Sequence, residues 1–246
     1  MDEKKLPNLA TPVAVVLAGI IIAGAIVYGN YNDKPAIAEG TDGFVAEKFI
    51  SVDNTDHIRG NKEAQIAIVE YSDLECPFCK VFHQSMNELM TTDGEKIAWV
   101  YRHFPIDSLH PKAFNEAIAS ECAMMLGGHD AFWKYADEIF AITPSNNGLD
   151  PAQLPQIAQK IGLDASKFNT CLKDQATQSR VNGDYENGID IGVDGTPFVL
   201  IAVKGGETYP IFKIDIKSIE NKEVQDLAEK IFKLYEKNIK AVSGNN

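Results

Sequence analysis

A CPFC tetrapeptide at residues 76–79 joins a stretch with the pattern of a strand to a stretch with the pattern of a helix. Residues 64–71 are rich in β-branched side chains, whereas residues 77–90 have apolar side chains at helical spacing. Proline is well suited to the first position of a helix. The sequence therefore predicts a strand that turns into a helix, with Cys76 at or near the N-cap and Cys79 one turn later on the buried side.

A cysteine at the start of a helix becomes acidic. Unpaired amide N–H groups and the positive end of the helix dipole stabilise a thiolate there, and the pKa of a cysteine falls from about 8.5 to roughly 3.5–7.5 in such positions. The thiolate is the form that attacks or leaves in disulfide exchange. We therefore predict a dithiol redox site, with Cys76 as the exposed attacking sulfur and Cys79 as the resolving sulfur.

Two other interpretations of the cysteine pair stay open. A CxxC pair can be half of a zinc site, with His83 on the same helical face as a third ligand, although a fourth ligand is hard to find. The pair could also form a purely structural disulfide, but such a pair seldom lies at a strand-to-helix turn with a proline inside it. We expect a redox site that holds neither a metal nor a cofactor.

An uncharged segment near the N-terminus predicts the location of the protein. No charged residue occurs from Leu6 to Asn32, and residues 9–29 are long and apolar enough to cross a bilayer. Lysines within residues 1–8 precede this segment, so the positive-inside rule leaves the N-terminus in the cytoplasm. We predict an uncleaved single-pass signal anchor in the cell membrane with an extracytoplasmic body. The alternative is a signal peptide cleaved near residues 36–38, which gives a secreted or periplasmic protein.

The exported compartment permits disulfides, which bears on all four cysteines. They divide into Cys76–Cys79 and Cys122–Cys171, and the second pair lies in two stretches with helical patterns. A bridge there closes a loop of about 50 residues and stabilises the fold by about 2–4 kcal/mol. Two buried free thiols are the alternative. The net charge of −12 argues against nucleic acid as a partner.

The remaining patterns predict an α/β sheet with an all-helical insertion at about residues 107–190. Residues 30–56 have the composition of a linker, residues 57–240 that of one domain, and residues 241–246 that of a flexible tail. After the CPFC helix we expect a strand at 97–104, helices at 110–127, 131–142, 151–161 and 164–189, a hairpin of strands at 198–203 and 208–212, and a helix at 222–240.

Pro197 stands at the start of the first hairpin strand, which is unusual because proline cannot donate a hydrogen bond to a sheet. A cis Thr196–Pro197 bond would expose the Thr196 backbone beside the CPFC segment. There it could pair with an extended substrate and keep metal ions from the sulfurs. A trans bond is the more frequent form for any residue before proline.

These motifs together resemble the DsbA-like branch of the thioredoxin superfamily, in particular the membrane-anchored or secreted disulfide oxidoreductases of bacteria. The resemblance implies a thioredoxin fold with a helical insertion, a cis Pro197, and exchange with reduced or misoxidised exported proteins. It also implies a membrane redox partner of the DsbB or VKOR type. The motifs are HIRGN at 57–61, EYSDLE at 70–75 before CPFC, YRHFP at 101–105, ECA at 121–123 with FW at 132–133, and GTP at 195–197.

The resemblance also implies roles for single residues. Glu70 falls where the superfamily commonly places a buried acid, which can exchange a proton with Cys79. Pro77, Phe78 and Glu75 are expected to tune the redox potential. The strongest oxidants of the family have a histidine inside the CxxC, so the neutral Phe78 predicts a more moderate oxidising power.

We therefore expect an extracytoplasmic, membrane-tethered thiol:disulfide oxidoreductase that acts mainly as an oxidase. A reductase or isomerase would use the same residues in the opposite redox state. A protein of another class, a metal-binding carrier or holdase, would use Cys76, Cys79 and His83 as ligands.

Overall fold

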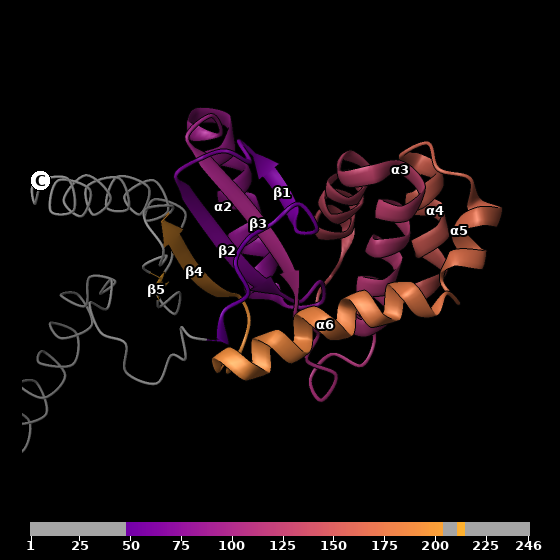
Figure 1. The fold of residues 1–246 in the computed structure, drawn as a ribbon. Helices are drawn as coiled ribbons and strands as arrows, with labels where there is room; N and C mark the ends of the chain where they lie inside the picture. The colour runs from indigo at the N-terminus through magenta and orange to yellow at the C-terminus, as the bar shows by residue number, and fades with distance from the viewer. Residues whose placement is uncertain (1–47, 204–210, 215–246) are drawn as a thin grey trace, which may run out of the picture. The chain divides into compact units, whose positions relative to one another are not determined.

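The computed structural model describes residues 48–203 and 211–214, and within them a five-stranded sheet with helices on both faces (Figure 1). The strand order is β1-β3-β2-β4-β5. Only β2 and β3 are parallel, and the other neighbours are antiparallel. The strands are β1 (His57–Gly60), β2 (Ile66–Ser72), β3 (Ile97–His103), β4 (Phe198–Val203) and β5 (Ile211–Ile214).

The two central strands are buried along their whole length, which agrees with their β-branched and aromatic residues. Ile68 and Trp99 point to the core that α2 and α3 cover. Val69 and Val100 point to the second core, which the end of α6 covers. Because side chains alternate between the faces of a strand, each strand contributes to both cores.

Helix α2 (Pro77–Asp93) connects the parallel strands β2 and β3, as parallel neighbours require a crossover. Phe82, Met86 and Leu89 lie buried on the side that faces the sheet. The turn from β2 to α2 therefore lies at the carboxyl end of a central strand, and this placement positions the cysteines.

The helical insertion follows β3 and lies beside the sheet (Figure 1). Its first helix, α3 (Ala113–Ile142), is kinked at Gly128, whose φ of 73° and ψ of −169° are not helical. A disulfide joins Cys122 in α3 to Cys171 at the end of α5. The other members are the 3-10 helix η2 (Pro151–Gln153) and the helices α4 (Leu154–Lys160), α5 (Ala165–Cys171) and α6 (Gln175–Ile191).

Some boundaries differ from those predicted. Strand β1 was not expected, and the helix predicted to begin at residue 110 begins at Ala113. The stretch predicted as one helix over 164–189 is two helices, because Asp174 caps the second one by accepting a hydrogen bond from the Ala176 amide. The predicted anchor, the tail, the last helix, and most of the linker and hairpin turn lie outside the described residues.

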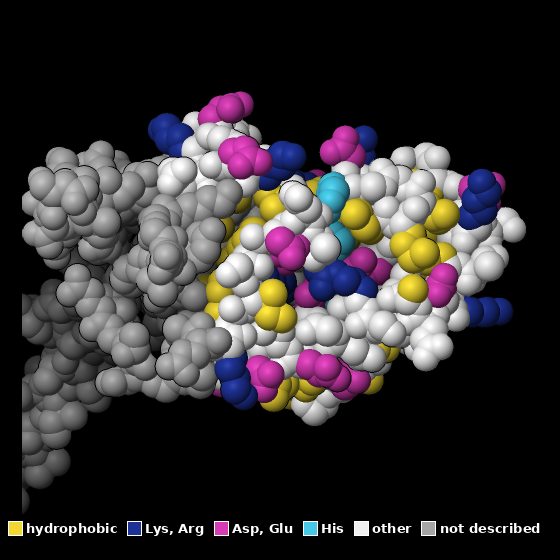
Figure 2. Space-filling view, viewed as in Figure 1, with side chains coloured by type: hydrophobic (Ala, Val, Ile, Leu, Met, Phe, Trp, Pro, Cys, Tyr) yellow, Lys and Arg dark blue, Asp and Glu magenta, His cyan; other side chains and the backbone are white. Residues whose placement is uncertain are grey.

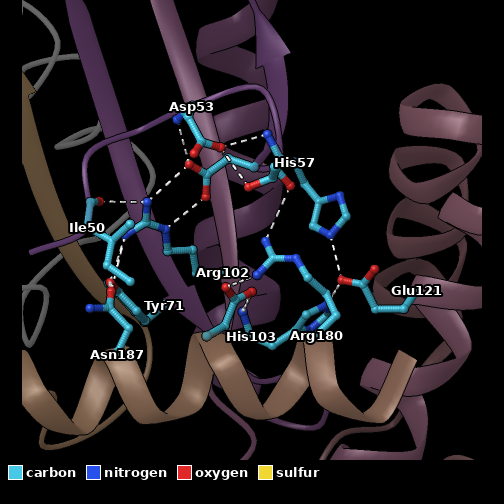
Figure 3. Close-up of polar contacts among 12 residues, drawn as sticks. Ile50, Asp53, His57, Tyr71, Arg102, His103, Glu121, Arg180 and Asn187 are labelled. Atoms are coloured by element: carbon cyan, nitrogen blue, oxygen red, sulfur yellow. Dashed lines mark hydrogen bonds and ion pairs between the residues drawn. The ribbon is translucent and has the colours of Figure 1, made fainter. Parts of the chain in front are cut away.

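Part of the predicted linker is folded against the sheet. Arg102 on β3 donates to both carboxylate oxygens of Asp56, at 2.9 and 3.1 Å, and to the carbonyl of Ile50 (Figure 3). It also contacts the hydroxyl of Tyr71 and, at 3.3 Å, the side chain of Asn187 on α6. The buried guanidinium thus ties the segment before β1 and helix α6 to the central strands. In the described part of the chain, no helix is both long and apolar enough to cross a membrane.

Candidate active site

Cys76 is the N-cap of α2, with φ −75° and ψ 123°, and Pro77 follows in the first turn. The Lys80 amide donates to the Cys76 carbonyl at 3.1 Å, which starts the helix. A hydrogen bond from the Cys79 thiol, together with the backbone N–H groups of Cys79 and Phe78, lowers the pKa of Cys76 to about 6, although burial opposes this. Cys76 is therefore mainly a thiolate at neutral pH.

Cys79 lies one turn along the helix and is fully buried. Burial and the neighbouring Cys76 raise its pKa well above the ordinary value. The Asp73 amide approaches its sulfur at 3.5 Å. The two free sulfurs thus differ in the manner that disulfide exchange requires, with an acidic thiol that attacks or leaves first and a neutral one that stays protonated.

The peptide bond between Thr196 and Pro197 is cis, and it lies just before β4. The Thr196 carbonyl oxygen is 3.4 Å from Sγ of Cys76 and accepts its hydrogen bond when the thiol is protonated. Cys76 is only 4% exposed, so the prediction of an exposed sulfur was wrong. The backbone beside Pro197 approaches the sulfur closely, and Phe78, which is 69% exposed, is the member of the CPFC segment that faces solvent.

Glu70 on β2 is fully buried. Its carboxyl accepts hydrogen bonds from Ser72 Oγ at 2.6 Å and from Trp99 Nε1 at 3.0 Å. Burial raises its pKa to about 8, and the charge of Cys76 adds to this effect. Glu70 also raises the pKa of Cys79. A carboxyl that is neutral at pH 7 and electrostatically coupled to both sulfurs can give and take a proton during exchange.

Asp73 was not predicted as a site residue, yet it contacts the whole turn. Its backbone carbonyl accepts from the Cys76 amide at 3.1 Å, and its Oδ1 accepts from the Glu75 amide at 2.8 Å. Its Oδ2 lies 2.8 Å from the Ile106 amide and 2.9 Å from Nδ1 of His110. The sequence contains a signal for this role, because an aspartate side chain commonly accepts a hydrogen bond from the amide two residues later, in an Asx-turn. Asp73 and Glu75 have this spacing.

A family model described as thioredoxin matches residues 52–234 of the chain. The chain belongs to the thioredoxin family. Among solved structures it is similar to DsbA2 of Pseudomonas aeruginosa, with a TM-score of 0.60 and 28% identity over 71% of this chain and 94% of that one. It also shares the fold of α-DsbA1 of Wolbachia pipientis, with a TM-score of 0.61 and 23% identity over 80% and 100% of the two chains. It is a DsbA-like member of the superfamily.

The curated relatives of this thioredoxin-family chain are longer proteins. It is 34% identical over 198 residues to Na(+)/H(+) antiporter NhaA 1 of Salinispora arenicola, a match that covers 80% of this chain and 29% of the relative. It is 32% identical over 148 residues to the NhaA 1 antiporter of Mycolicibacterium vanbaalenii, which covers 59% and 23%. The chain thus spans less than a third of the length of these relatives.

Glu75 lies directly before Cys76 but is fully buried, with its backbone and carboxylate held by a neighbouring loop. The Asn146 amide donates to its carbonyl at 2.8 Å, and the Asn147 amide donates to its Oε2. Both asparagines have positive φ, 51° and 66°. Burial and a hydrogen bond with Glu75 raise the pKa of Glu116 to about 10, so Glu116 is protonated at neutral pH.

His83 does not belong to a metal site with the cysteines. It is buried, and its Nε2 lies 2.7 Å from Oδ1 of Asp137. The described residues contain one group whose atoms could hold an ion, formed by His57, His103 and Glu121. On the face shown in Figure 2, histidine side chains lie between the sheet and the helices of the insertion.

The geometry of the group formed by His57, His103 and Glu121 favours a hydrogen-bonded triad over a metal centre. The Nε2 atoms of His57 and His103 lie 2.6 and 3.0 Å from the same oxygen of Glu121 (Figure 3 shows the contact with His57). Neither Nδ1 has a hydrogen-bond partner in the described part of the chain. An ion at Nε2 would move both ring protons to Nδ1, where metal-bound histidines need an acceptor, and so would leave two buried donors unpaired.

Proposed function

We propose that this chain is an extracytoplasmic, membrane-tethered thiol:disulfide oxidoreductase that acts mainly as an oxidase of exported proteins. The observation that supports it best is the acidic Cys76 at the N-cap of α2, 3.4 Å from the Thr196 carbonyl beside Pro197. The likeness to DsbA2 supports the same class of reaction. The compartment rests on the uncharged segment at residues 9–29.

In the proposed reaction, a substrate thiolate attacks Sγ of Cys76 in the Cys76–Cys79 disulfide. Cys79 leaves and takes a proton from Glu70, whose raised pKa keeps it protonated at neutral pH. The second substrate thiolate then attacks the mixed disulfide, and Cys76 leaves as the stabilised thiolate. Two electrons thereby pass to the site and the substrate gains a disulfide. Of the two protons lost by the substrate thiols, one returns Glu70 to its protonated form, and the other leaves the reacting groups because Cys76 departs as a thiolate.

The deciding measurement is the redox potential of the Cys76–Cys79 pair, obtained by equilibrating the full chain with glutathione buffers and counting free thiols. A potential above about −200 mV supports a disulfide donor, whereas one near about −270 mV or below assigns the pair to reduction or isomerisation. A Cys76→Ser variant should lose oxidation of a reduced test protein. Retained activity in that variant would refute the role of Cys76.

A Cys79→Ser variant is the matched control for this experiment. It keeps the acidic thiol at Cys76 but lacks the resolving sulfur, so an oxidised test peptide should remain bound to it as a mixed disulfide. Retention of a metal ion without exchange activity would instead support a carrier. For turnover we propose a membrane redox partner of the DsbB or VKOR type, and we propose no antiport for this chain.

A further inference from the structure

His110 is a buried titratable residue that the exchange reaction described above does not use. It lies in the loop between β3 and α3 and is 6% exposed. Its amide donates to the Ile106 carbonyl at 2.8 Å, and its carbonyl accepts from the Ala113 amide at 2.9 Å. Its backbone is therefore held at both ends of the loop, which fixes where the ring can lie.

The ring of His110 is connected through one residue, Asp73, to the sulfur of Cys79 and to the backbone of Cys76. Its Nδ1 lies 2.9 Å from Oδ2 of Asp73, while the Asp73 amide contacts Sγ of Cys79 at 3.5 Å and the Asp73 carbonyl accepts from the Cys76 amide at 3.1 Å. The side chain of Asn146 also hydrogen-bonds the ring. His110 thus contacts the turn that holds the cysteines without contacting a sulfur itself.

Two negative groups act on the His110 ring. Although burial alone would lower it, the hydrogen bond and the charge of Asp73 raise the pKa of His110, and the charge of Cys76 raises it further. Two other carboxyl groups feel the charge of Asp73. Asp107 and Glu116 both have raised pKa values, and the charge of Asp73 is one cause in each case.

The charge on Cys76 exists only in the reduced protein. In the disulfide this sulfur is neutral, so the ring of His110 then has Asp73 as its remaining anionic partner. Reduction adds a negative charge near the ring and strengthens its hold on a proton. We propose that His110 takes up a proton when the Cys76–Cys79 disulfide is reduced, and that Asp73 positions the ring for this role.

The step balances in atoms, electrons and charge. A substrate dithiol gives two electrons and two protons to the oxidised protein with neutral His110. The products are a substrate disulfide, a Cys76 thiolate, a Cys79 thiol and a protonated His110. One proton is then on Cys79 and one on His110, so the site retains both protons of its substrate. Without His110, one of the two protons passes to the solvent.

The direct test compares the titration of His110 in the two redox states of the full wild-type chain. Histidine ring resonances are followed by NMR against pH, once with the disulfide formed and once after reduction. The chain has five histidines, and the spectrum of a His110→Gln variant assigns the signal. We expect a higher pKa for His110 in the reduced protein. Equal pKa values in the two states would overturn the proposal.

A second readout is the number of protons bound per disulfide reduced, taken from the pH dependence of the equilibrium with glutathione. At pH values between the pKa of His110 in the oxidised protein and its pKa in the reduced protein, His110→Gln should bind fewer protons per disulfide reduced than the wild type. Its equilibrium with glutathione should shift about three- to tenfold toward the disulfide form of the protein, so the variant should be a weaker oxidant than the wild type. His129→Gln, which removes a histidine outside this site, is the matched control.

Glu70 also responds to the charge of Cys76, so a Glu70→Gln variant separates the two groups. In Glu70→Gln, the number of protons bound per disulfide reduced should differ from the wild type near pH 8, which is a different pH range from that affected in His110→Gln.

The proposal rests on the thiol:disulfide function proposed above, and the two can fail separately. If the wild-type chain exchanges no disulfides, the function is wrong. If it exchanges them with the same proton count in His110→Gln, only the role of His110 is wrong.

Discussion

The carbonyl oxygen of Thr196 lies 3.4 Å from the sulfur of Cys76, although the two residues are 120 positions apart in the chain. The contact brings the segment before β4 to the first turn of α2. It leaves Cys76 only 4% exposed. Phe78, two residues later in the same turn, is 69% exposed.

The reactivity of Cys76 should follow its acidic thiol. Since the pKa of Cys76 is lowered to about 6 and that of Cys79 is raised, alkylation of the reduced protein should modify Cys76 first. The rate should reach half of its plateau near pH 6. Mass spectrometry of the modified peptides at several pH values measures this. A midpoint near the ordinary value of about 8.5 would contradict the lowered pKa of Cys76 at the start of α2.

Glu70→Gln should slow the exchange of Cys79 while stabilising the fold. Loss of a general acid or base commonly reduces a rate by about 10²-fold or more. The lifetime of a mixed disulfide with a test peptide, measured from pH 6 to 9, should lengthen and lose its inflection near pH 8. Ser72→Ala is the matched control, because it removes a hydrogen bond to Glu70 but keeps the titrating group.

The change in the free energy of unfolding that Glu70→Gln causes should depend on pH. The carboxyl has a pKa raised from 4.5 to about 8 in the folded protein, so the native state binds its proton more tightly than the unfolded state does. This contribution is complete below pH 4.5 and is lost as the pH rises toward 8. At pH 8 the variant should therefore exceed the wild type by a few kcal/mol, at about 1.4 kcal/mol per pKa unit, in urea unfolding.

The triad of His57, His103 and Glu121 predicts acid sensitivity. Burial lowers the pKa of His57, and hydrogen bonds from His103 and His57 lower that of Glu121 against the effect of its own burial. Both folded pKa values lie below the unfolded ones. The unfolded state therefore binds more protons, and stability is lost as the pH falls below about 6.5 for His57 and below about 4.3 for Glu121.

Glu121→Gln tests this triad directly. Removing one partner of a buried charged group should lower the free energy of unfolding by about 3 kcal/mol at pH 7, measured by urea titration. The loss relative to the wild type should shrink as the pH falls below about 4.3, toward the lowered folded pKa of Glu121. An unchanged pH profile would mean that the triad is not ionised. Glu88→Gln on α2, at a residue not assigned to this triad, is a control for the loss of a carboxylate.

The Cys122–Cys171 disulfide should affect stability and leave the redox site unchanged. It joins residues 49 positions apart, and removing a bridge of this kind typically costs about 2–5 kcal/mol. A double variant with Ala at both positions should unfold at lower urea concentration. Its Cys76–Cys79 equilibrium with glutathione should match the wild type, since the bridge joins α3 to α5 within the insertion, whereas the CPFC turn starts α2. A change in that equilibrium would mean that the insertion is coupled to the site.

Local patterns allowed several features to be predicted. The strand before CPFC, the helix after it and the break near Gly128 depend on neighbours in sequence, and so does the start of α2 at Cys76. The short strand β1 was missed because four residues are too few for a period to be recognised. The helix predicted over residues 164–189 is interrupted because the Asp174 side chain starts a new helix.

The sequence by itself determined the CPFC turn, the Gly-Thr-Pro segment and the helical insertion, because each of them depends on residues that are close to one another in the chain. Only the tertiary structure placed His110 against Asp73, 37 residues earlier, and Glu116 against Glu75. It also decided how deeply Cys76 and Glu75 are buried. Burial and the field of neighbouring charges set the pKa of a group, and both depend on residues that are distant in sequence and adjacent only after folding.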